Sequence, residues 1–208
     1  MEQSVKEEKW NFLTHALGTV LSIVGLVILL LNNEHNSNYA TFSIWVYSFS
    51  ACLLFTASAL YHYVSVVATK TLLRKFDHIG IYFLIAGTYT PVCLISLADG
   101  IGGRFFWIVW GITALGVVLK LFFTGRFEAL SLLLYLAMGW LIVFDFNNLM
   151  EVLTKQQLVL LILGGVFYTI GTVFYAIKKI PFHHVIWHLF VLAGAIAHFL
   201  MILAIVRG

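Results

Sequence analysis

Seven long runs of apolar residues follow one another along the chain, each separated from the next by a short polar segment. The hydrocarbon core of a bilayer is about 30 Å thick, and a helix needs about 20 apolar residues to cross it. The runs lack the alternation of polar and apolar positions that marks a membrane β-strand, and a backbone in lipid must pair its polar groups internally. The pattern therefore predicts helices over residues 11–31, 39–65, 76–98, 105–123, 129–146, 158–177 and 184–206.

The connecting segments are short and polar, as in 32–38, 99–104 and 150–157, and indicate surface turns rather than linkers. No small-residue cleavage site follows the first run, so we interpret it as a retained helix and not as a signal peptide. We predict an all-α polytopic membrane protein, in which residues 1–208 form a single seven-helix membrane domain.

Composition supports the same class, since 62% of the 208 residues are apolar and only 10% are charged. A soluble domain is about 45–50% apolar and about 25% charged. The net charge of +3 is too small to indicate a nucleic-acid surface. We expect a multi-pass protein of the bacterial cytoplasmic membrane, with a membrane lipid as its substrate or ligand.

The distribution of positive charge predicts the orientation, because lysine and arginine favour cytoplasmic loops. With seven spans, nine of the twelve basic residues lie on the side of the N-terminus, and only Arg104, Lys155 and Arg207 lie on the other. We therefore predict a cytoplasmic N-terminus and an outside C-terminus.

Ionisable residues inside membrane spans are candidates for function. His62 ends the second predicted span, Asp77 begins the third, and His184 and His188 begin the seventh, all at the predicted cytoplasmic face. Residues four apart share a helix face, so His184 and His188 can hold one ion. Three imidazoles with one open position are typical of catalytic zinc, and Asp77 would hold or deprotonate a zinc-bound water.

Several alternatives stay open at this point. Interfacial histidines can simply meet lipid head groups, and spacing alone does not decide between that role and metal binding. Glu8, Asn11 and His15 share one face at the start of the first span, where either packing or support of the site would explain them. His198 lies too far along its helix to bind the same ion, and a structural hydrogen bond is expected of it.

Four segments together resemble the bacterial hemolysin III family, which is related to the progestin and adipoQ receptors within the alkaline-ceramidase-like superfamily of membrane hydrolases. The segments are EEKWNFLTHALG, SALYH, KFDHIGIYFLIAGTYTP and HHVIWHLFVLAGAIAHF. The resemblance implies a seven-helix fold with zinc bound by His62, His184 and His188. It also implies that Asp77 contacts the zinc-bound water and that Ser58 lies near the metal.

Three functions follow as hypotheses. The first is a zinc-dependent, ceramidase-like hydrolase of a lipid amide or ester, with Asp77 and Ser58 as its catalytic residues. The second is a membrane-homeostasis or lipid-sensing protein in which zinc is structural. The third, suggested by the family name, is a pore-forming cytolysin, which is physically the weakest because a secreted toxin must be soluble before it inserts.

Overall fold

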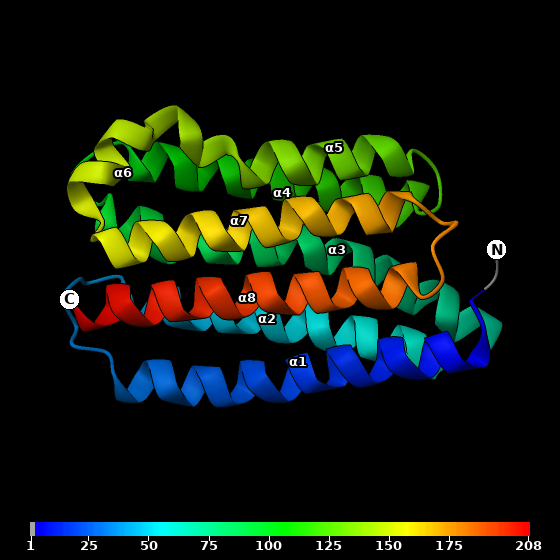
Figure 1. Ribbon diagram of the computed structural model, residues 1–208. Coiled ribbons are helices and arrows are strands. Elements are labelled where there is room, and N and C mark those ends of the chain that lie inside the picture. Colours follow the sequence, from blue (N-terminus) through cyan, green and yellow to red (C-terminus); the bar gives the residue numbers. More distant parts are fainter. Residues whose placement is uncertain (1–2) are drawn as a thin grey trace.

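The computed structural model describes residues 3–208, and within that range seven helical segments are long and apolar enough to cross a membrane (Figure 1). This confirms the prediction of an all-α, seven-helix membrane protein. The predicted domain begins at residue 1, so its first two residues lie outside the described part. The spans are α1 (Val5–Leu31), α2 (Ala40–Tyr63), α3 (Val67–Pro91) with its π-helical extension η1 (Val92–Ser96), α4 (Gly102–Phe123), a composite fifth span (Glu128–Val152), α7 (Lys155–Ala176) and α8 (His183–Arg207).

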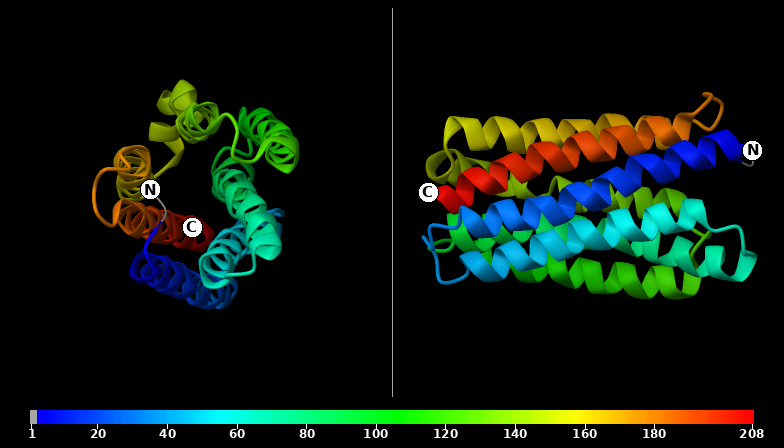
Figure 2. Two further views of the ribbon diagram at one scale, coloured as in Figure 1. Left: turned by 90° about the vertical axis from the view of Figure 1, so that its right-hand side faces the viewer. Right: turned by 90° about the horizontal axis from the view of Figure 1, so that it is seen from below.

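The helices run side by side and the two ends of the chain lie at opposite ends of the bundle (Figure 1). Seen along the bundle axis, they form a ring in chain order that α8 closes by packing against α1 (Figure 2, left). The core is built mainly by α2, α3 and α8, whereas the fifth span packs more sparsely against its neighbours. We call the end that carries His62 and His184 the histidine end; it is the end predicted to face the cytoplasm.

Helix α1 begins earlier than predicted, at Val5 rather than at residue 11. Ser4 and Glu7 form a capping box: Ser4 Oγ accepts from the Glu7 backbone N–H, and the Glu7 carboxylate accepts from the Ser4 backbone N–H at 2.8 Å. Such a box satisfies amide groups that have no partner within the helix. The polar first turns are therefore helical, and Glu8 is held at the histidine end.

Helix α3 also begins earlier, at Val67 rather than at Phe76. Residues 67–75 carry three basic side chains, which made them look like a loop on hydropathy alone. Lysine, arginine, leucine and alanine are good helix formers, and basic side chains near a membrane interface can extend toward water. Asp77 therefore lies inside a continuous helix rather than at its first position.

The fifth span is not the continuous helix that its apolar run predicted. It consists of α5 (Glu128–Gly139), the 3₁₀-helix η2 (Leu141–Asp145) and α6 (Phe146–Val152). Tyr89 of α3 compensates the break, because its hydroxyl donates to the Gly139 carbonyl at 3.1 Å and accepts from the Ile142 N–H at 2.9 Å. A helix can break in lipid where another part of the protein satisfies the freed backbone groups.

Candidate metal centre

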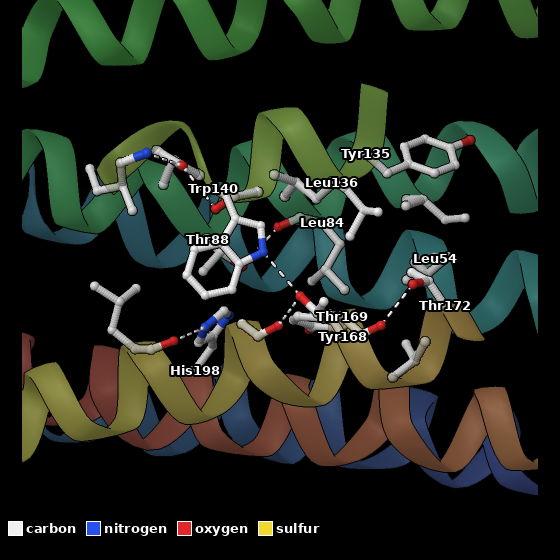
Figure 3. Close-up of a pocket in the computed structure, with 18 of the residues that line it drawn as sticks. Leu54, Leu84, Thr88, Tyr135, Leu136, Trp140, Tyr168, Thr169, Thr172 and His198 are labelled. Carbon is white, nitrogen blue, oxygen red and sulfur yellow. Dashed lines mark hydrogen bonds between the residues drawn. The ribbon is translucent and has the colours of Figure 1, made fainter. Parts of the chain in front are cut away.

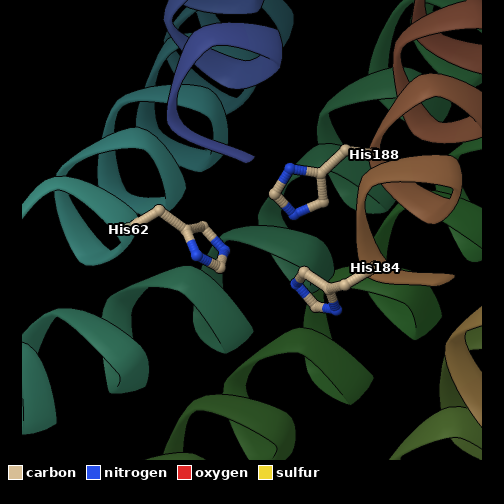
Figure 4. A group of neighbouring side chains, drawn as sticks. All are labelled: His62, His184 and His188. Atoms are coloured by element: carbon tan, nitrogen blue, oxygen red, sulfur yellow. The ribbon is translucent and has the colours of Figure 1, made fainter. Parts of the chain in front are cut away.

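Three histidines meet at the histidine end, as the spacing argument expected. His62 comes from the last turn of α2, and His184 and His188 from the first turns of α8. One ligand atom from each lies within 4.8 Å of the others, and the side chains point toward one another (Figure 4). The ring centroids are 4.6 to 5.2 Å apart. This arrangement can bind a metal ion.

The start of α8 is fixed by the residues before it. Phe182 has a left-handed backbone with φ of 57°, which a helix cannot continue through, so α8 begins at His183. The Phe182 N–H donates to Glu7 Oε1 at 3.0 Å, which ties this loop to the start of α1. His184 and His188 consequently occupy the first and second turns, on the face directed at α2.

Two of the three histidines have an acceptor on their Nδ1 atoms. His62 Nδ1 lies 2.6 Å from Glu8 Oε2, and His188 Nδ1 lies 3.3 Å from the Asn11 carbonyl oxygen. An acceptor on Nδ1 places the proton there and leaves the Nε2 lone pair free, which is the arrangement that metal-bound histidines show in proteins.

The second nitrogen of the His62 ring is also suited to binding a metal ion. Its Nε2 is buried and has no hydrogen-bond partner anywhere in residues 3–208. A buried polar atom without a partner is unfavourable unless a ligand satisfies it. Neutral imidazole nitrogens are ligands that zinc accepts readily, so the residues fit the ion that the resemblance implies.

His15 supports the cluster through packing. Its ring stacks on that of His188 with centroids 3.5 Å apart and planes 8° apart, and it meets the Phe55 ring edge to face with centroids 5.2 Å apart. The stack restricts rotation of the His188 ring. Of the residues on this face of α1, Glu8 and Asn11 contact the rings through polar atoms, and His15 contacts one by stacking.

Asp77 and Ser58 are placed by close packing of α2 against α3. A Cβ atom on Gly80 would lie 2.7 Å from Leu54 Cα, so only glycine allows this approach. One turn nearer the histidine end, the same pairing of the two helices sets Asp77 beside Ser58 and near His62. Ser58 is fully buried, and its hydroxyl lies beside the Asp77 carboxylate with no other hydrogen-bond partner among the described residues. The Asp77 carboxylate is not one of the three clustered ligands.

The cluster opens onto a cavity of about 180 Å³ at the histidine end. Its wall is partly polar and includes Asp77, His184 and His188, together with Arg74, Glu128 and Lys178. Arg74, Glu128 and Lys178 are not predicted as site residues from the sequence; Arg74 and Lys178 are two of the nine basic residues on the side of the N-terminus. Glu128 forms an ion pair with Arg74 and lies near Lys178. A contact between residues so far apart in the sequence leaves no local signal.

A second cavity, of about 110 Å³, lies between α3, α5 and α7 and is almost wholly apolar (Figure 3). The two cavities adjoin, because Leu54, Ile81, Trp187 and Val191 line both. The pair is partly polar at the histidine end and apolar toward the middle of the bundle. A single-chain amphiphile has the same distribution of polarity.

Trp140 and His198 lie at the far part of this apolar cavity (Figure 3). Trp140 Nε1 donates to Thr169 Oγ1 at 3.0 Å and so joins the fifth span to α7. His198 Nε2 lies 3.1 Å from the Leu161 carbonyl oxygen, which agrees with the structural hydrogen bond expected for this residue. His198 takes no part in the three-histidine cluster.

Comparison with known proteins identifies relatives along nearly the whole chain. A family model described as "Haemolysin-III related" matches residues 3–199. The chain is 43% identical to the "Hemolysin-3 homolog" of Bacillus subtilis, over 96% of this chain and 94% of the relative. It is 41% identical to "Hemolysin-3" of Bacillus cereus, over 98% and 93% respectively. The human "Monocyte to macrophage differentiation factor" is 31% identical, over 93% of this chain and 82% of its own length.

Proposed function

The chain belongs to the haemolysin-III-related family of multi-pass cell-membrane proteins, and from that premise we propose that it is a zinc-dependent hydrolase of a lipid amide or ester. The observation that carries the proposal is the position of the three histidines. His184 and His188 line a partly polar cavity that adjoins an apolar one, so a group bound there can face a metal ion while an attached lipid chain lies in the apolar space.

In this proposal His62, His184 and His188 hold zinc. When bound in such a site, zinc supplies Lewis acidity, which polarises a carbonyl group and lowers the pKa of water toward about 7. The Glu8 carboxylate and the Asn11 carbonyl orient two of the rings through their Nδ1 atoms. Their role is to keep the ligand atoms directed at one point, which limits the reorganisation that binding requires.

Asp77 acts as the general base. Its carboxylate lines the cavity but stands apart from the three ligand atoms, which suits a group that takes a proton from the attacking water. The same carboxylic acid then returns the proton to the departing amine or alcohol. Ser58, whose hydroxyl has no other partner in residues 3–208, donates a hydrogen bond to Asp77 or to the oxygen on which negative charge develops.

The adjoining cavities support a lipid as the substrate. An acyl chain placed in the apolar cavity between α3, α5 and α7 removes its surface from water, while the amide or ester group stays beside the histidines. The substrate enters from the bilayer, since the whole site lies within membrane-spanning helices. The expected partner is thus a membrane lipid.

A second candidate is a lipid-sensing or membrane-homeostasis protein with structural zinc. The contacts of His62 with α1, and of His188 with α1, favour it, because an ion on these rings would hold α1, α2 and α8 together. In that case, removing the metal unfolds the histidine end. Under the hydrolase proposal, metal removal abolishes turnover while most of the bundle stays folded.

The test combines metal analysis with lipid turnover by the purified protein. We expect about one zinc per chain, hydrolysis that a chelator stops and zinc restores, and loss of both metal and turnover in His188→Ala. His35→Ala is the matched control, because His35 is an exposed histidine outside the membrane-spanning helices. Unchanged hydrolysis by metal-free protein would refute the proposal; no hydrolysis together with loss of the fold would favour the second candidate.

A further inference from the structure

Arg74 lies on the wall of the partly polar cavity beside the histidine cluster. One face of α3 lines this cavity, through Arg74, Asp77, His78 and Ile81. Residues three or four apart lie on the same face of a helix. From the histidine end inward, that face carries a guanidinium, then the carboxylate proposed as the base, and then Ile81, which also lines the apolar cavity.

The Arg74 guanidinium is always charged and keeps unused hydrogen-bond donors. An arginine side chain has five N–H donors and is not deprotonated in proteins. Within residues 3–208 Arg74 donates to Glu128 Oε1 alone, from Nη2 at 2.6 Å. Its side chain is 39% exposed. A ligand in the cavity can therefore reach the remaining donors, and the charge that would attract it cannot be lost by titration.

Lys178, in the loop between α7 and α8, is a second cation on the wall of this cavity. Its Nζ lies 3.8 Å from Glu128 Oε2, and its side chain is 64% exposed. Both cations thus lie close to the same carboxylate, so one anionic group can reach the two of them together. The Asp77 carboxylate lies apart from this group, beside Ser58. Two cations with one carboxylate leave a net positive charge at the rim of the cavity.

The proposed hydrolase leaves one part of its lipid undefined, namely the group on the far side of the amide or ester bond. With the acyl chain in the apolar cavity and the carbonyl group beside the histidines, this group lies toward Arg74. Arg74 and Asp77 are three residues apart in α3, a rise of about 4.5 Å, so a group bound by Arg74 must follow the scissile bond closely. A guanidinium forms strong hydrogen bonds with carboxylates and phosphates. The contacts of Glu128 demonstrate that a carboxylate fits between the two cations.

We propose that Arg74 and Lys178 bind a carboxylate attached next to the amide group, so that the substrate is a single-chain N-acyl amino acid. This inference rests on the proposed hydrolase and deepens it by naming the substrate class. Water adds across the amide C–N bond: the acyl carbon takes the hydroxyl group and leaves as a fatty acid, and the nitrogen takes the proton and leaves as the amine of a free amino acid. Glu128 holds the two cations in the empty cavity and competes with the substrate for them.

The experiment measures ligand binding by the metal-free full chain in phosphatidylcholine nanodiscs, and turnover by the zinc-loaded chain. The two probes are N-palmitoylglycine and N-palmitoylglycinamide, which differ only in that the first has a carboxylate where the second has a neutral amide. We expect the wild type to bind N-palmitoylglycine at least about tenfold more tightly, which is the effect of one charge-assisted hydrogen bond. The same preference should appear in kcat/KM.

Substitutions of the rim separate ligand binding from support of the fold. Arg74→Met should bring the ratio of the two affinities close to one, and Lys178→Met should lower it less, because Lys178 is more exposed. Glu128→Gln should raise the ratio above that of the wild type, since it removes the competing carboxylate. If Arg74 served only its ion pair with Glu128, Arg74→Met and Glu128→Gln would change the ratio in the same direction. Arg126→Met is the matched control, because Arg126 is an exposed arginine at the same end that lines neither cavity, and its ratio should equal that of the wild type.

Equal binding of the two probes by the wild type, or an unchanged ratio in Arg74→Met, overturns the carboxylate site. An equal fall in Arg126→Met reduces it to diffuse surface attraction. Palmitoyl lysophosphatidic acid and monopalmitoylglycerol provide the matched phosphate test. An Arg74-dependent preference for that phosphate, without one for N-palmitoylglycine, overturns the carboxylate as the group that is bound.

The two measurements also distinguish failure of this inference from failure of the hydrolase. Equal turnover of both amides by the zinc-loaded chain overturns the N-acyl amino acid as the preferred substrate and leaves the hydrolase in place. Preferential binding of N-palmitoylglycine by the metal-free chain, with no turnover of either amide after zinc is added, overturns the hydrolase and the substrate class while the carboxylate site stands.

Discussion

Replacement of Glu8 by glutamine tests how the metal centre is held. Glu8 Oε2 lies 2.6 Å from His62 Nδ1, and Glu8 Oε1 accepts from Lys70 Nζ at 2.9 Å. Glutamine keeps the size of the side chain and removes its charge. It can also turn its amide group toward His62 and donate to Nδ1, which moves the ring proton to Nε2 and blocks the atom that should bind metal.

The expected loss of zinc affinity in Glu8→Gln follows from the position of Glu8. It contacts a ligand and not the metal, and loss of such a partner typically costs about 10- to 100-fold in metal affinity. That range corresponds to about 1.4 to 2.7 kcal/mol. The effect should be near its upper end, because His62 is almost completely buried and water cannot readily replace the lost acceptor.

The assay is competition for zinc between the purified protein and a chelator of known affinity. Glu151→Gln is the control for loss of one negative charge, since Glu151 is exposed near the end of the fifth span and far along the chain from the cluster. Lys70→Met removes the ion pair but leaves the carboxylate on His62, so it should weaken zinc binding less than Glu8→Gln does.

A zinc affinity of Glu8→Gln within about twofold of the wild type would refute the role of Glu8 in holding His62, because a charged hydrogen-bond partner of a buried ligand contributes more than that. An equal loss in Lys70→Met and Glu8→Gln would also refute it. That result would mean that the ion pair with α3 holds the site, and that the contact with the imidazole does not.

Three further predictions follow from the packing around the centre. Asp77→Asn should retain zinc but lose about 100-fold or more in lipid turnover, measured at saturating substrate; unchanged turnover would contradict its role as the base. Gly80→Val should lower the unfolding midpoint, since its side chain meets the α2 backbone at Leu54 and overpacking typically costs about 1–3 kcal/mol. Tyr89→Phe removes the hydroxyl that bonds two backbone groups of the fifth span. The unfolding midpoint in nanodiscs should therefore fall by an amount equivalent to about 1–3 kcal/mol. Tyr39→Phe, at an exposed tyrosine, should leave the midpoint unchanged.

The helices could be predicted from the sequence because hydropathy and length are local properties of a membrane span. The break at Gly139 could not, because the run from 129 to 146 is apolar throughout and its compensation comes from Tyr89, far away in the sequence. The start of α3 at Val67 was missed for a related reason. Hydropathy marks the edge of the hydrocarbon, whereas a helix continues past that edge wherever its residues allow it.

The meeting of His62 with His184 and His188 could be predicted because chain reversal places the end of one span and the start of another at the same face. The partners of the rings were harder to identify. Spacing placed Glu8 and Asn11 on one helix face but left their role open, and only the packing of α1 against α2 and α8 brings them to the Nδ1 atoms.

The number of ligands favours a catalytic over a structural role for a metal at this site. Structural zinc is usually closed by four protein ligands, whereas catalytic zinc keeps one position for water or substrate. Within residues 3–208 the cluster supplies three histidine nitrogens, and the nearby carboxylate of Asp77 stands outside it while lining the same cavity. His184 and His188 therefore line a cavity that adjoins an apolar one. A site meant only to fasten α1, α2 and α8 would need no such cavity, and a pore would need a polar path across the bilayer, whereas the adjoining cavity is apolar.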